Sequence, residues 1–342
     1  MKKILVKETN WLGDIIMSMP ALRAVRRHFP DAHLAVLVKD NLAAIFNDSP
    51  IVDEVIPYRF RRGLGGVGDR FRVGRTLKAK GFDAAVLFPN SLDAAIVAFL
   101  ARIPRRVGYA RDGRSLLLTD RVTVSKDILE VHQARYYLNL VTVLGVESDD
   151  TDAGLWVSPP ARERMLQYLR KNGVADGAKL VAFAAGAAYG PAKEWGRERF
   201  ARLAARLAAD HGVRLILVGA PRERADADRL FQLIGNDALN AVGETALDEL
   251  VALLSMCTAF VGNDSGAMHV AGALGIPTVG IFGSTRPDRT GPLGARSTFL
   301  KSDVECAPCL KRVCANGDYR CMESITVTMV EDALRELGAF SP

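Results

Sequence analysis

A short polar turn, Asn263-Asp264-Ser265-Gly266, follows a hydrophobic run and begins a predicted helix of small residues. Asparagine, aspartate and serine are preferred at the N-cap, where backbone N–H groups lack partners within the helix. These N–H groups and the positive end of the helix dipole attract anions. The small Ser265 and Gly266 let a diphosphate approach the backbone, and His269 adds a side-chain donor further along. The stretch therefore predicts a diphosphate site, although a capped core helix with a buried histidine explains it equally well in isolation.

Two further side chains follow predicted strands in the second half of the chain. Lys193 lies in a Gly/Ala-rich loop after the strand at 180–183, and Glu223 lies in the turn after the strand at 214–218. A lysine on such a loop suits a phosphate clamp, although the loop lacks the G-x-x-x-x-G-K-[ST] pattern of a Walker loop. Glu223 suits contacts with ribose hydroxyls, and a first-turn carboxylate of the next helix is the plainer alternative.

Asp14 is the candidate acid–base residue of the first half. It follows the turn at 8–13, which comes after a predicted strand at 3–7, and it begins a predicted helix that runs to about residue 29. As an N-cap, Asp14 needs no further role. As a general base it needs a position in a cleft and an acceptor hydroxyl within hydrogen-bond reach. Its place in the loop after the first strand points the carboxylate toward such a cleft.

Similar polar positions follow later strands of the first half. Asn90 and Ser91 come directly after the predicted strand at 84–88 and are interpreted as helix caps facing the same cleft. His132 opens a helix that ends near residue 144. This histidine either contacts an acceptor or packs in the protein interior.

The elements that position these residues alternate between strand and helix. Hydrophobic runs predict strands at 3–7, 34–38, 54–57, 84–88 and 107–108, and then at 180–183, 214–218 and 278–282. This alternation is typical of the α/β class with a doubly wound parallel sheet. Ligands of such sheets bind at the carboxyl ends of the strands. No G-x-G-x-x-G follows the first strand, so a dinucleotide fingerprint is absent.

The length of 342 residues and a turn-rich acidic segment at 145–160 predict two domains. We place them at residues 1–158 and 159–325, two Rossmann-like halves that face a central cleft. Residues 326–342 are expected to form a terminal helix that packs back on the first domain. No apolar leader with a cleavage site follows Met1, so we expect a cytoplasmic protein.

The net charge of +6 is concentrated in the first half of the chain. Residues 59–80 carry eight basic side chains, Arg62 among them, against the single Asp69, and more arginines follow as far as Arg114. A solvated face is one interpretation. A site for phosphates or carboxylates at an anionic membrane surface is the other. No nucleic-acid-binding motif accompanies the charge, so we expect no nucleic-acid partner.

Four cysteines form a C-x2-C-x4-C-x6-C pattern: Cys306, Cys309, Cys314 and Cys321. Close spacing in a cytoplasmic protein favours a structural zinc site over disulfides. The spacing is not that of a standard finger or ribbon, so reduced thiols remain the alternative. We assign the cluster no catalytic role.

With these residues laid out, the chain resembles family nine of the glycosyltransferases, the lipopolysaccharide heptosyltransferases of the GT-B fold. The motifs that carry the resemblance are NWLGDIIMSMPAL (10–22), PNS (89–91), GPAKEW (190–195), GNDSGAMHVAGALGIPTVGIFG (262–283) and CAPCLKRVC with RCM (306–322). The resemblance covers nearly the whole chain. Together the motifs are most similar to the branch that adds the second heptose of the inner core.

The resemblance implies an inverting transfer of heptose from ADP-L-glycero-β-D-manno-heptose to the heptose of a heptosyl-Kdo2-lipid A acceptor. Asp14 would be the general base, and Lys193 would stabilise the departing diphosphate. The ADP part would contact Lys193, Glu223, Asp264, Ser265, Gly266 and His269 in the 159–325 domain. The acceptor would contact Asn10, Trp11, Asn90, Ser91 and His132 in the 1–158 domain.

The implied chemistry agrees with the residue types. Inversion needs one carboxylate to take the proton of the attacking hydroxyl. A lysine and a helix N-terminus can stabilise a diphosphate leaving group, so no catalytic cofactor is expected. The arginines of 59–114 would suit a phosphorylated acceptor at the inner face of the cytoplasmic membrane.

Three alternatives remain open at this point. Heptosyltransferases I and III share the donor and the fold but use other acceptors. A nucleotide-sugar epimerase of the same fold would turn over the donor without an acceptor. A nucleotide-sugar-binding or membrane-surface assembly protein would have no activity that depends on Asp14.

Overall fold

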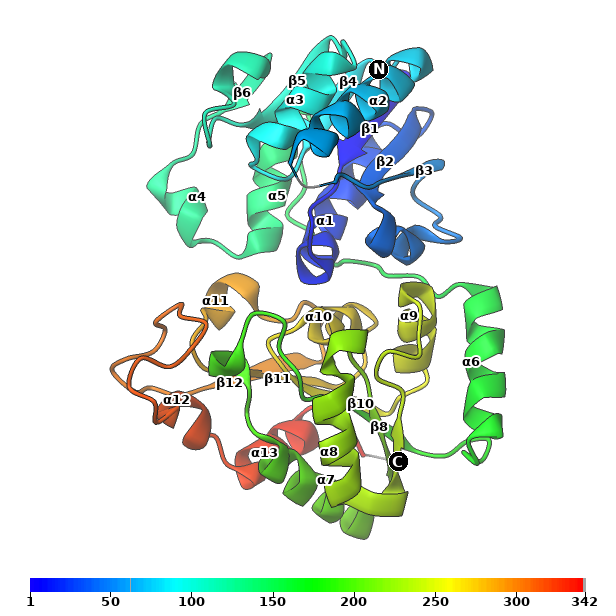
Figure 1. Cartoon of the computed structure of the whole chain (residues 1–342), viewed down its shortest axis with the longest axis vertical. Helices are drawn as coiled ribbons and strands as arrows, with labels where there is room; N and C mark the ends of the chain where they lie inside the picture. The colour runs from blue at the N-terminus through cyan, green and yellow to red at the C-terminus, as the bar shows by residue number, and fades with distance from the viewer. Residues whose placement is uncertain (62, 341–342) are drawn as a thin grey trace. The chain divides into compact units, whose positions relative to one another are not determined.

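The computed structural model describes residues 1–61 and 63–340. Arg62 of the basic run and the last two residues of the predicted terminal segment therefore lie outside the described residues. The chain divides into two compact units, Met1–Gly154 and Leu155–Pro342. Figure 1 shows the order of the elements in each unit.

The N-terminal unit is built on a parallel sheet of six strands in the order β3-β2-β1-β4-β5-β6. The strands are β1 (Lys3–Lys7), β2 (His33–Lys39), β3 (Glu54–Tyr58), β4 (Ala84–Leu87), β5 (Arg105–Tyr109) and β6 (Asp120–Val122). The central strands are buried on both faces, as expected for a parallel sheet between helices. In register, Leu5 of β1 lies opposite Ala35 of β2 and Ala85 of β4.

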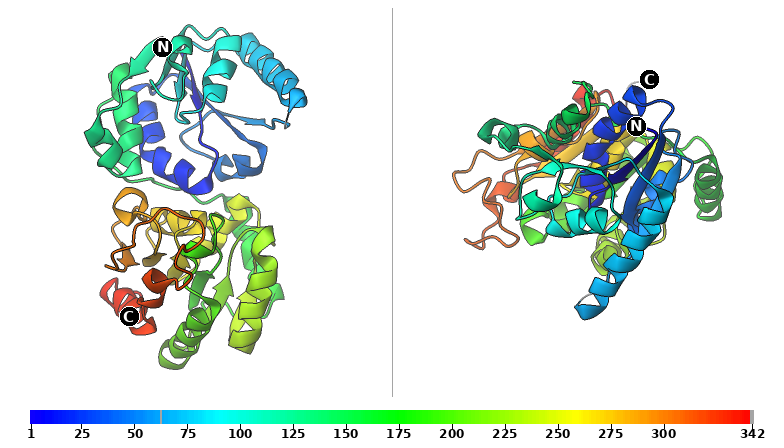
Figure 2. Two further views of the ribbon diagram at one scale, coloured as in Figure 1. Left: turned by 60° about the vertical axis from the view of Figure 1, so that its left-hand side comes forward. Right: turned by 90° about the horizontal axis from the view of Figure 1, so that it is seen from above.

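Helices cover both faces of this sheet. The N-terminal helices are α1 (Leu12–His28), α2 (Leu64–Lys80), α3 (Leu92–Leu100), α4 (Lys126–Glu130) and α5 (Gln133–Val141), with 3-10 turns η1 (Asp40–Phe46), η2 (Ser115–Leu117) and η3 (Thr142–Leu144). α2 and α3 pack together over one face, where Leu77 and Ala98 join Leu5 and Leu87 of the strands in one core. α1 packs against α5 in the other layer (Figure 2).

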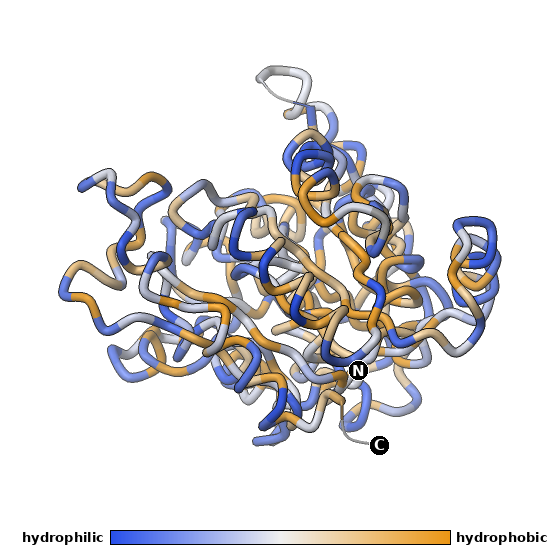
Figure 3. The backbone as a smooth tube through the Cα atoms, turned by 90° about the horizontal axis from the view of Figure 1, so that it is seen from below, coloured by the Kyte–Doolittle hydropathy of each residue, from blue (hydrophilic) through white to orange (hydrophobic). Residues whose placement is uncertain are grey.

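The C-terminal unit repeats this architecture with the strand order β12-β11-β10-β7-β8-β9, again with every neighbouring pair parallel. Its strands are β7 (Leu180–Ala184), β8 (Arg214–Leu217), β9 (Ala238–Asn240), β10 (Ala259–Asn263), β11 (Thr278–Phe282) and β12 (Ser297–Lys301). The predicted doubly wound parallel α/β class is thus confirmed in both halves of the chain. In Figure 3 the hydrophobic segments lie mainly inside, and the outer helices carry both colours.

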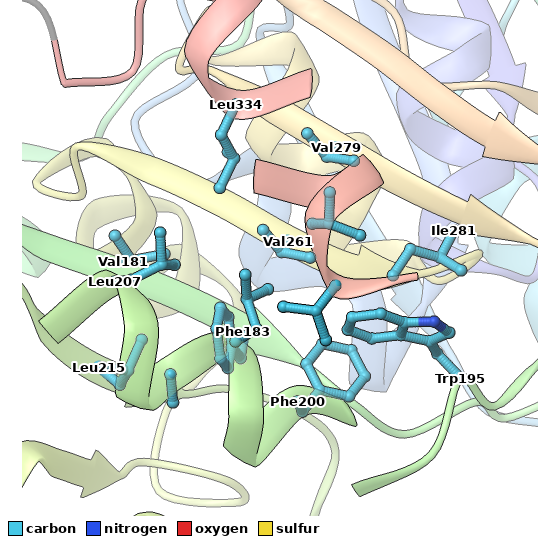
Figure 4. Packing of buried hydrophobic residues seen from close by; sticks show 14 of the residues in the cluster. Val181, Phe183, Trp195, Phe200, Leu207, Leu215, Val261, Val279, Ile281 and Leu334 are labelled. Atoms are coloured by element: carbon cyan, nitrogen blue, oxygen red, sulfur yellow. The ribbon is translucent and has the colours of Figure 1, made fainter. Parts of the chain in front are cut away.

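The helices of this unit are α6 (Pro159–Lys171), α7 (Arg197–His211), α8 (Arg224–Ile234), α9 (Leu247–Ser255), α10 (Gly266–Ala273), α11 (Pro287–Thr290), α12 (Arg320–Glu323) and α13 (Val327–Glu336), with 3-10 turns η4 (Pro191–Lys193), η5 (Pro221–Glu223) and η6 (Gly235–Asp237). Figure 4 shows one core of the unit, in which Phe200 and Leu207 of α7 pack against Phe183 of β7.

The terminal helix packs differently from the prediction. α13 contacts α7, β11 and β12 of its own unit instead of packing back on the N-terminal domain. Val330 and Leu334 lie one turn apart on α13, and both are fully buried in the core of the C-terminal unit. This apolar stripe needs a partner surface, and α7 with the strands β11 and β12 supplies it.

Candidate active site

Each sheet has one topological switch point, where consecutive connections leave in opposite directions along the sheet. In the N-terminal unit it lies between β1 and β4, and in the C-terminal unit between β7 and β10. Ligands of doubly wound sheets bind in the crevice outside the strand ends at this point. The residues singled out from the sequence follow these same four strands, except for Glu223 after β8 and His132 before α5.

Asp14 lies in the first turn of α1, not in the loop before it. Trp11 is the N-cap residue, makes no side-chain cap and is 60% exposed. The helix begins two residues earlier than predicted, so Asp14 does not cap it. Asp14 is the acidic residue of the first turn of α1, which is the positive end of the helix dipole. Asn10, just before the helix, accepts a hydrogen bond from the Tyr58 hydroxyl at 3.0 Å.

Glu8 is a second carboxyl group near Asp14, and the sequence analysis did not select it. Its side chain is fully buried at the end of β1, where Oε2 accepts hydrogen bonds from Ser18 Oγ at 2.9 Å and Thr9 N at 3.2 Å. Ser18 lies four residues after Asp14 and hence on the same face of α1. A charged residue directly after a buried strand was the available sequence signal.

Burial raises the pKa of Glu8 to about 7 and lowers the pKa of the adjacent Lys7 to about 7. The Lys7 ammonium donates to the Glu8 carbonyl at 2.7 Å and lies over the Tyr58 ring. Burial, together with the nearby Asp14 carboxylate, holds the pKa of Tyr137 well above its ordinary value. Asp14 and Glu8 thus share the neighbourhood of Tyr137.

The remaining candidate acceptor contacts have structural partners of their own. Ser91 caps α3 by accepting from Ala94 N, and His132 caps α5 through Nδ1, which accepts from Ala134 N at 3.1 Å. Asn90 Nδ2 donates to the Tyr136 hydroxyl at 3.0 Å. Ser91 is a cap as predicted, but Asn90 precedes the cap, and His132 is a half-buried cap instead of a packed histidine. A contact of these residues with an acceptor stays a prediction.

The basic run divides into buried and exposed members. Arg114 is fully buried, with Nε donating to Tyr109 O at 3.0 Å and Nη1 to Pro89 O, and burial lowers the pKa of Arg114 to about 10. Arg105 pairs with Asp120 at 2.9 Å. These two arginines hold the N-terminal unit together, so only other basic residues of 59–114 remain candidates for contact with an acceptor.

In the C-terminal unit, Lys193 and Asp264 meet across the switch point. Lys193 Nζ lies 2.5 Å from Asp264 Oδ2, and both side chains are nearly buried. The same oxygen accepts from the Thr285 hydroxyl at 2.7 Å. The loop after β7, the start of α10 and the loop after β11 therefore converge on one carboxylate.

Buried contacts fix the loop that carries Lys193. The side chain of Trp195 is fully buried, and its indole N–H donates to Ile325 O at 2.7 Å (Figure 4). Asn263, at the end of β10, accepts from Trp195 N at 3.1 Å and donates to Ala185 O at 2.6 Å. Asn263 thus ties both ends of the Lys193 loop to the strand that leads into α10.

The start of α10 offers unused hydrogen-bonding groups. Ser265 is the N-cap residue but makes no side-chain cap, and its buried hydroxyl has no partner within residues 1–61 and 63–340. Gly266 opens the helix beside it, and His269 is buried one turn further on. Buried polar groups are normally satisfied, so the unpaired Ser265 hydroxyl and the free N–H groups suit an anionic ligand.

Glu223 ends η5, where Oε2 accepts from Ala220 N at 2.9 Å. Its carboxyl group lies against the loops after β7 and β8. A Cβ atom on Gly186 would meet Glu223 Cδ at 2.7 Å, and one on Gly219 would meet Oε2 at 2.5 Å. Glycine at both positions therefore makes room for this carboxylate.

The four clustered cysteines do not form the expected zinc site. They line one cavity of about 90 Å³, but the described part of the chain holds no group of three Cys, His, Asp or Glu side chains that could hold a metal ion. Cys306 and Cys309 are exposed on the loop after β12, whereas Cys321 is buried in α12. All are free thiols.

The C-terminal site combines the Lys193 ammonium group, a helix N-terminus and the unpaired Ser265 hydroxyl, which suits a diphosphate. The N-terminal site places the Asp14 carboxyl group in the first turn of α1, just after β1, which suits proton abstraction from a hydroxyl. A reaction between a donor that carries a diphosphate leaving group and an acceptor hydroxyl is typical of glycosyl transfer. A fold of two doubly wound units is typical of enzymes that catalyse it.

Comparison with known proteins agrees with this class. The model of glycosyltransferase family 9 (heptosyltransferase) matches residues 70–320. The chain belongs to this family, so it is a glycosyltransferase, and the family predicted from the motifs is confirmed.

Individual members of this family are similar to the chain over nearly its whole length. The chain is 30% identical to lipopolysaccharide heptosyltransferase 2 of Escherichia coli K12 over 98% of both chains. The solved structure of E. coli ADP-heptose lps heptosyltransferase II matches with a TM-score of 0.84 at 28% identity, over 98% of both chains. The E. coli heptosyltransferase WaaC with ADP-2-deoxy-2-fluoro heptose matches with a TM-score of 0.73 at 21% identity, over 98% of this chain and 99% of that one, and shows the fold.

None of the described helices has the length and apolar character needed to span a membrane.

Proposed function

We propose that this protein transfers L-glycero-D-manno-heptose from ADP-heptose to the first heptose of the Kdo2-lipid A inner core, with inversion, in lipopolysaccharide biosynthesis. The observation that carries the proposal is the pairing of Lys193 with Asp264 at the start of α10 in a member of family 9. The full-length likeness to lipopolysaccharide heptosyltransferase 2 supports the choice of acceptor.

In this proposal the C-terminal unit binds the donor. The ammonium group of Lys193 and the N–H groups at Ser265 and Gly266 contact the diphosphate, and His269 adds a further donor. Glu223 contacts the ribose. Asp264 contacts the donor through Lys193, because its Oδ2 already holds that ammonium group at 2.5 Å. These groups stabilise the negative charge of the departing ADP, so the proposal includes no catalytic cofactor.

The N-terminal unit binds the acceptor, with Asn10, Trp11, Asn90, Ser91 and His132 around it. Asp14 takes the proton of the acceptor hydroxyl while its oxygen attacks the anomeric carbon from the face opposite ADP. The bond from that carbon to the diphosphate oxygen breaks, and its electron pair leaves with ADP. One displacement of this kind inverts the anomeric configuration.

The proposed acceptor is a membrane lipid, so we place the reaction at the inner face of the cytoplasmic membrane. Exposed basic side chains of the N-terminal unit would attract the anionic leaflet.

The test is ADP release from ADP-heptose, with and without heptosyl-Kdo2-lipid A. We expect release to depend on the acceptor and to collapse in Asp14→Asn, while donor binding by calorimetry stays unchanged. Asp31→Asn, an exposed aspartate after α1, is the matched control. Equal release from wild type and Asp14→Asn would remove Asp14 from the mechanism.

Other outcomes of the same assay separate the alternatives. Turnover with Kdo2-lipid A but not with its heptosylated form would assign the acceptor of heptosyltransferase I. Turnover only with a longer core acceptor would assign heptosyltransferase III. Conversion of the donor without any acceptor would indicate an epimerase.

A further inference from the structure

Two neighbouring helices of the N-terminal unit expose large apolar side chains. Val67 and Phe71 of α2 are 50% and 58% exposed, and Leu92 and Phe99 of α3 are 44% and 51% exposed. Positions four and seven residues apart lie on one face of a helix, so each pair forms a stripe. Exposed stripes of this kind mark surfaces that bind something.

The two stripes belong to one surface. α2 and α3 pack side by side over the same sheet face, and their approach is close at Gly74, where a Cβ atom would lie 2.7 Å from Leu100 Cβ. The inward sides of both helices are buried in a shared core. Their outward sides therefore adjoin, and we call them the α2–α3 face.

The same face is strongly basic. Arg72, Arg75 and Lys78 of α2 are exposed, and Arg102 is exposed just after α3. Within residues 1–61 and 63–340, no ion pair involves Arg75, Lys78 or Arg102.

The acidic groups of these helices are already engaged. Asp69 accepts hydrogen bonds from Arg61 Nη2 at 2.9 Å and from Arg61 N. Asp93 pairs with Arg70. Asp69 also pairs with Arg72 at 3.3 Å, so the positive charge left without an ion pair on the α2–α3 face, among residues 1–61 and 63–340, is that of Arg75, Lys78 and Arg102.

We propose that the α2–α3 face docks on an anionic lipid bilayer, with Phe71 and Phe99 entering the boundary of the acyl chains. Basic and apolar side chains on one surface fit the lipid interface, where phosphates lie directly above acyl chains. A nucleic acid would engage the arginines but leave the apolar stripes in water. The Arg106 guanidinium lies 5.7 Å from the centre of the Phe99 ring, so a basic side chain and an apolar side chain of this region are in contact with each other.

This inference deepens the proposed function by naming the surface that brings the enzyme to a lipid acceptor. It rests on the proposed function only for its biological purpose, because lipid docking is measured without the reaction. The exposed arginines and lysine bind lipid phosphates, and none of them is assigned to the donor site or to Asp14.

The test is sedimentation of the full chain with two kinds of vesicle, phosphatidylcholine alone and phosphatidylcholine mixed with phosphatidylglycerol. We expect binding to the anionic vesicles only, and less of it at high salt. Two double variants, Phe71→Ser with Phe99→Ser and Arg75→Gln with Lys78→Gln, should each bind about tenfold more weakly. All four side chains are exposed at least in part, so thermal midpoints should not change.

The matched control is Leu233→Ser with Arg229→Gln, an exposed apolar–basic pair four residues apart on α8. Unchanged vesicle binding in the α2–α3 variants, or an equal loss in the control, would overturn the proposal. A lack of binding of the wild-type protein to anionic vesicles would also overturn the proposal. It would indicate that the α2–α3 face binds a protein partner.

Transfer to a delipidated, water-soluble acceptor separates the two proposals. The α2–α3 variants should keep wild-type rates on it and lose rate only on acceptor embedded in anionic vesicles. No transfer by wild type to either acceptor, together with normal vesicle binding, would reject the proposed function and retain the docking surface.

Discussion

Lys193 Nζ and Asp264 Oδ2 lie 2.5 Å apart, so the proposed diphosphate-binding ammonium is held by a carboxylate before any ligand arrives. The pair comes from the loop after β7 and the residue after β10, which flank the switch point. A diphosphate must share Lys193 with Asp264. The carboxylate therefore sets the direction of the ammonium group, while the start of α10 supplies the remaining donors.

Replacing Lys193 by glutamine should lower kcat for heptosyl transfer by about 10²-fold, because the leaving diphosphate loses its nearest positive charge. Asp264→Asn should act less strongly on kcat and should weaken the positioning of Lys193. Lys179→Gln, an exposed lysine at the amino end of β7, is the control. Steady-state ADP release measures the effect, and an unchanged kcat in Lys193→Gln would contradict the assigned role.

Asn263→Ala should destabilise the C-terminal unit by about 2–4 kcal/mol, because the fully buried side chain makes two hydrogen bonds to the Lys193 loop. Asn263→Asp keeps the oxygen that accepts from Trp195 N but loses the donor to Ala185 O. It should therefore be intermediate. Urea unfolding followed by hydrogen exchange of the C-terminal unit's amides measures the change. Equal stability of Asn263→Ala and wild type would show that the two hydrogen bonds of Asn263 do not stabilise the Lys193 loop.

Glu8 should make the N-terminal unit less stable as the pH rises from 5 to 7. The pKa of Glu8 is about 7 in the folded protein against 4.5 in the free side chain, so the folded state holds a proton that the unfolded state has released. Stability falls with pH wherever the folded state binds more protons. This contribution amounts to about 2 kcal/mol between pH 5 and pH 7.

Glu8→Gln is the variant that isolates this effect. Its stability should not show the loss between pH 5 and 7, because glutamine does not titrate. Lys7, whose pKa is lowered to about 7, acts in the opposite sense and adds stability as the pH rises above 7. Hydrogen exchange of the β1 amides reports the opening free energy of this unit. If the stability of wild type and Glu8→Gln changed with pH in the same way, the titrating group would be a residue other than Glu8.

The free thiols should differ sharply in their reaction with iodoacetamide. Hydrogen bonds from backbone N–H groups, that of Tyr319 first, lower the pKa of Cys314. Burial raises the pKa of Cys257 to about 12. The thiolate is the nucleophile, so Cys314 should be alkylated at neutral pH and Cys257 should stay unmodified in the folded protein. Peptide mass mapping measures this order, and early alkylation of Cys257 would contradict its burial in the native state.

The sequence alone determined the order of the elements, the doubly wound class and the strand ends that carry most of the candidate residues. These features follow from local patterns, because the alternation of strands and helices forces a parallel sheet whose carboxyl ends share one edge. Lys193 could be selected for this reason, as it follows a predicted strand, whereas Asp264 and Ser265 were selected as a polar turn between a hydrophobic run and a predicted helix.

The tertiary structure alone decided which of these side chains meet. Lys193 and Asp264 are 71 residues apart in the chain, and only the strand order brings their loops together. Arg114 and the exposed Arg75 belong to the same basic run, yet one is buried and the other faces solvent. Glu8 became a candidate only through its burial beside Ser18. Burial and pairing depend on contacts between distant segments, which local sequence patterns do not encode.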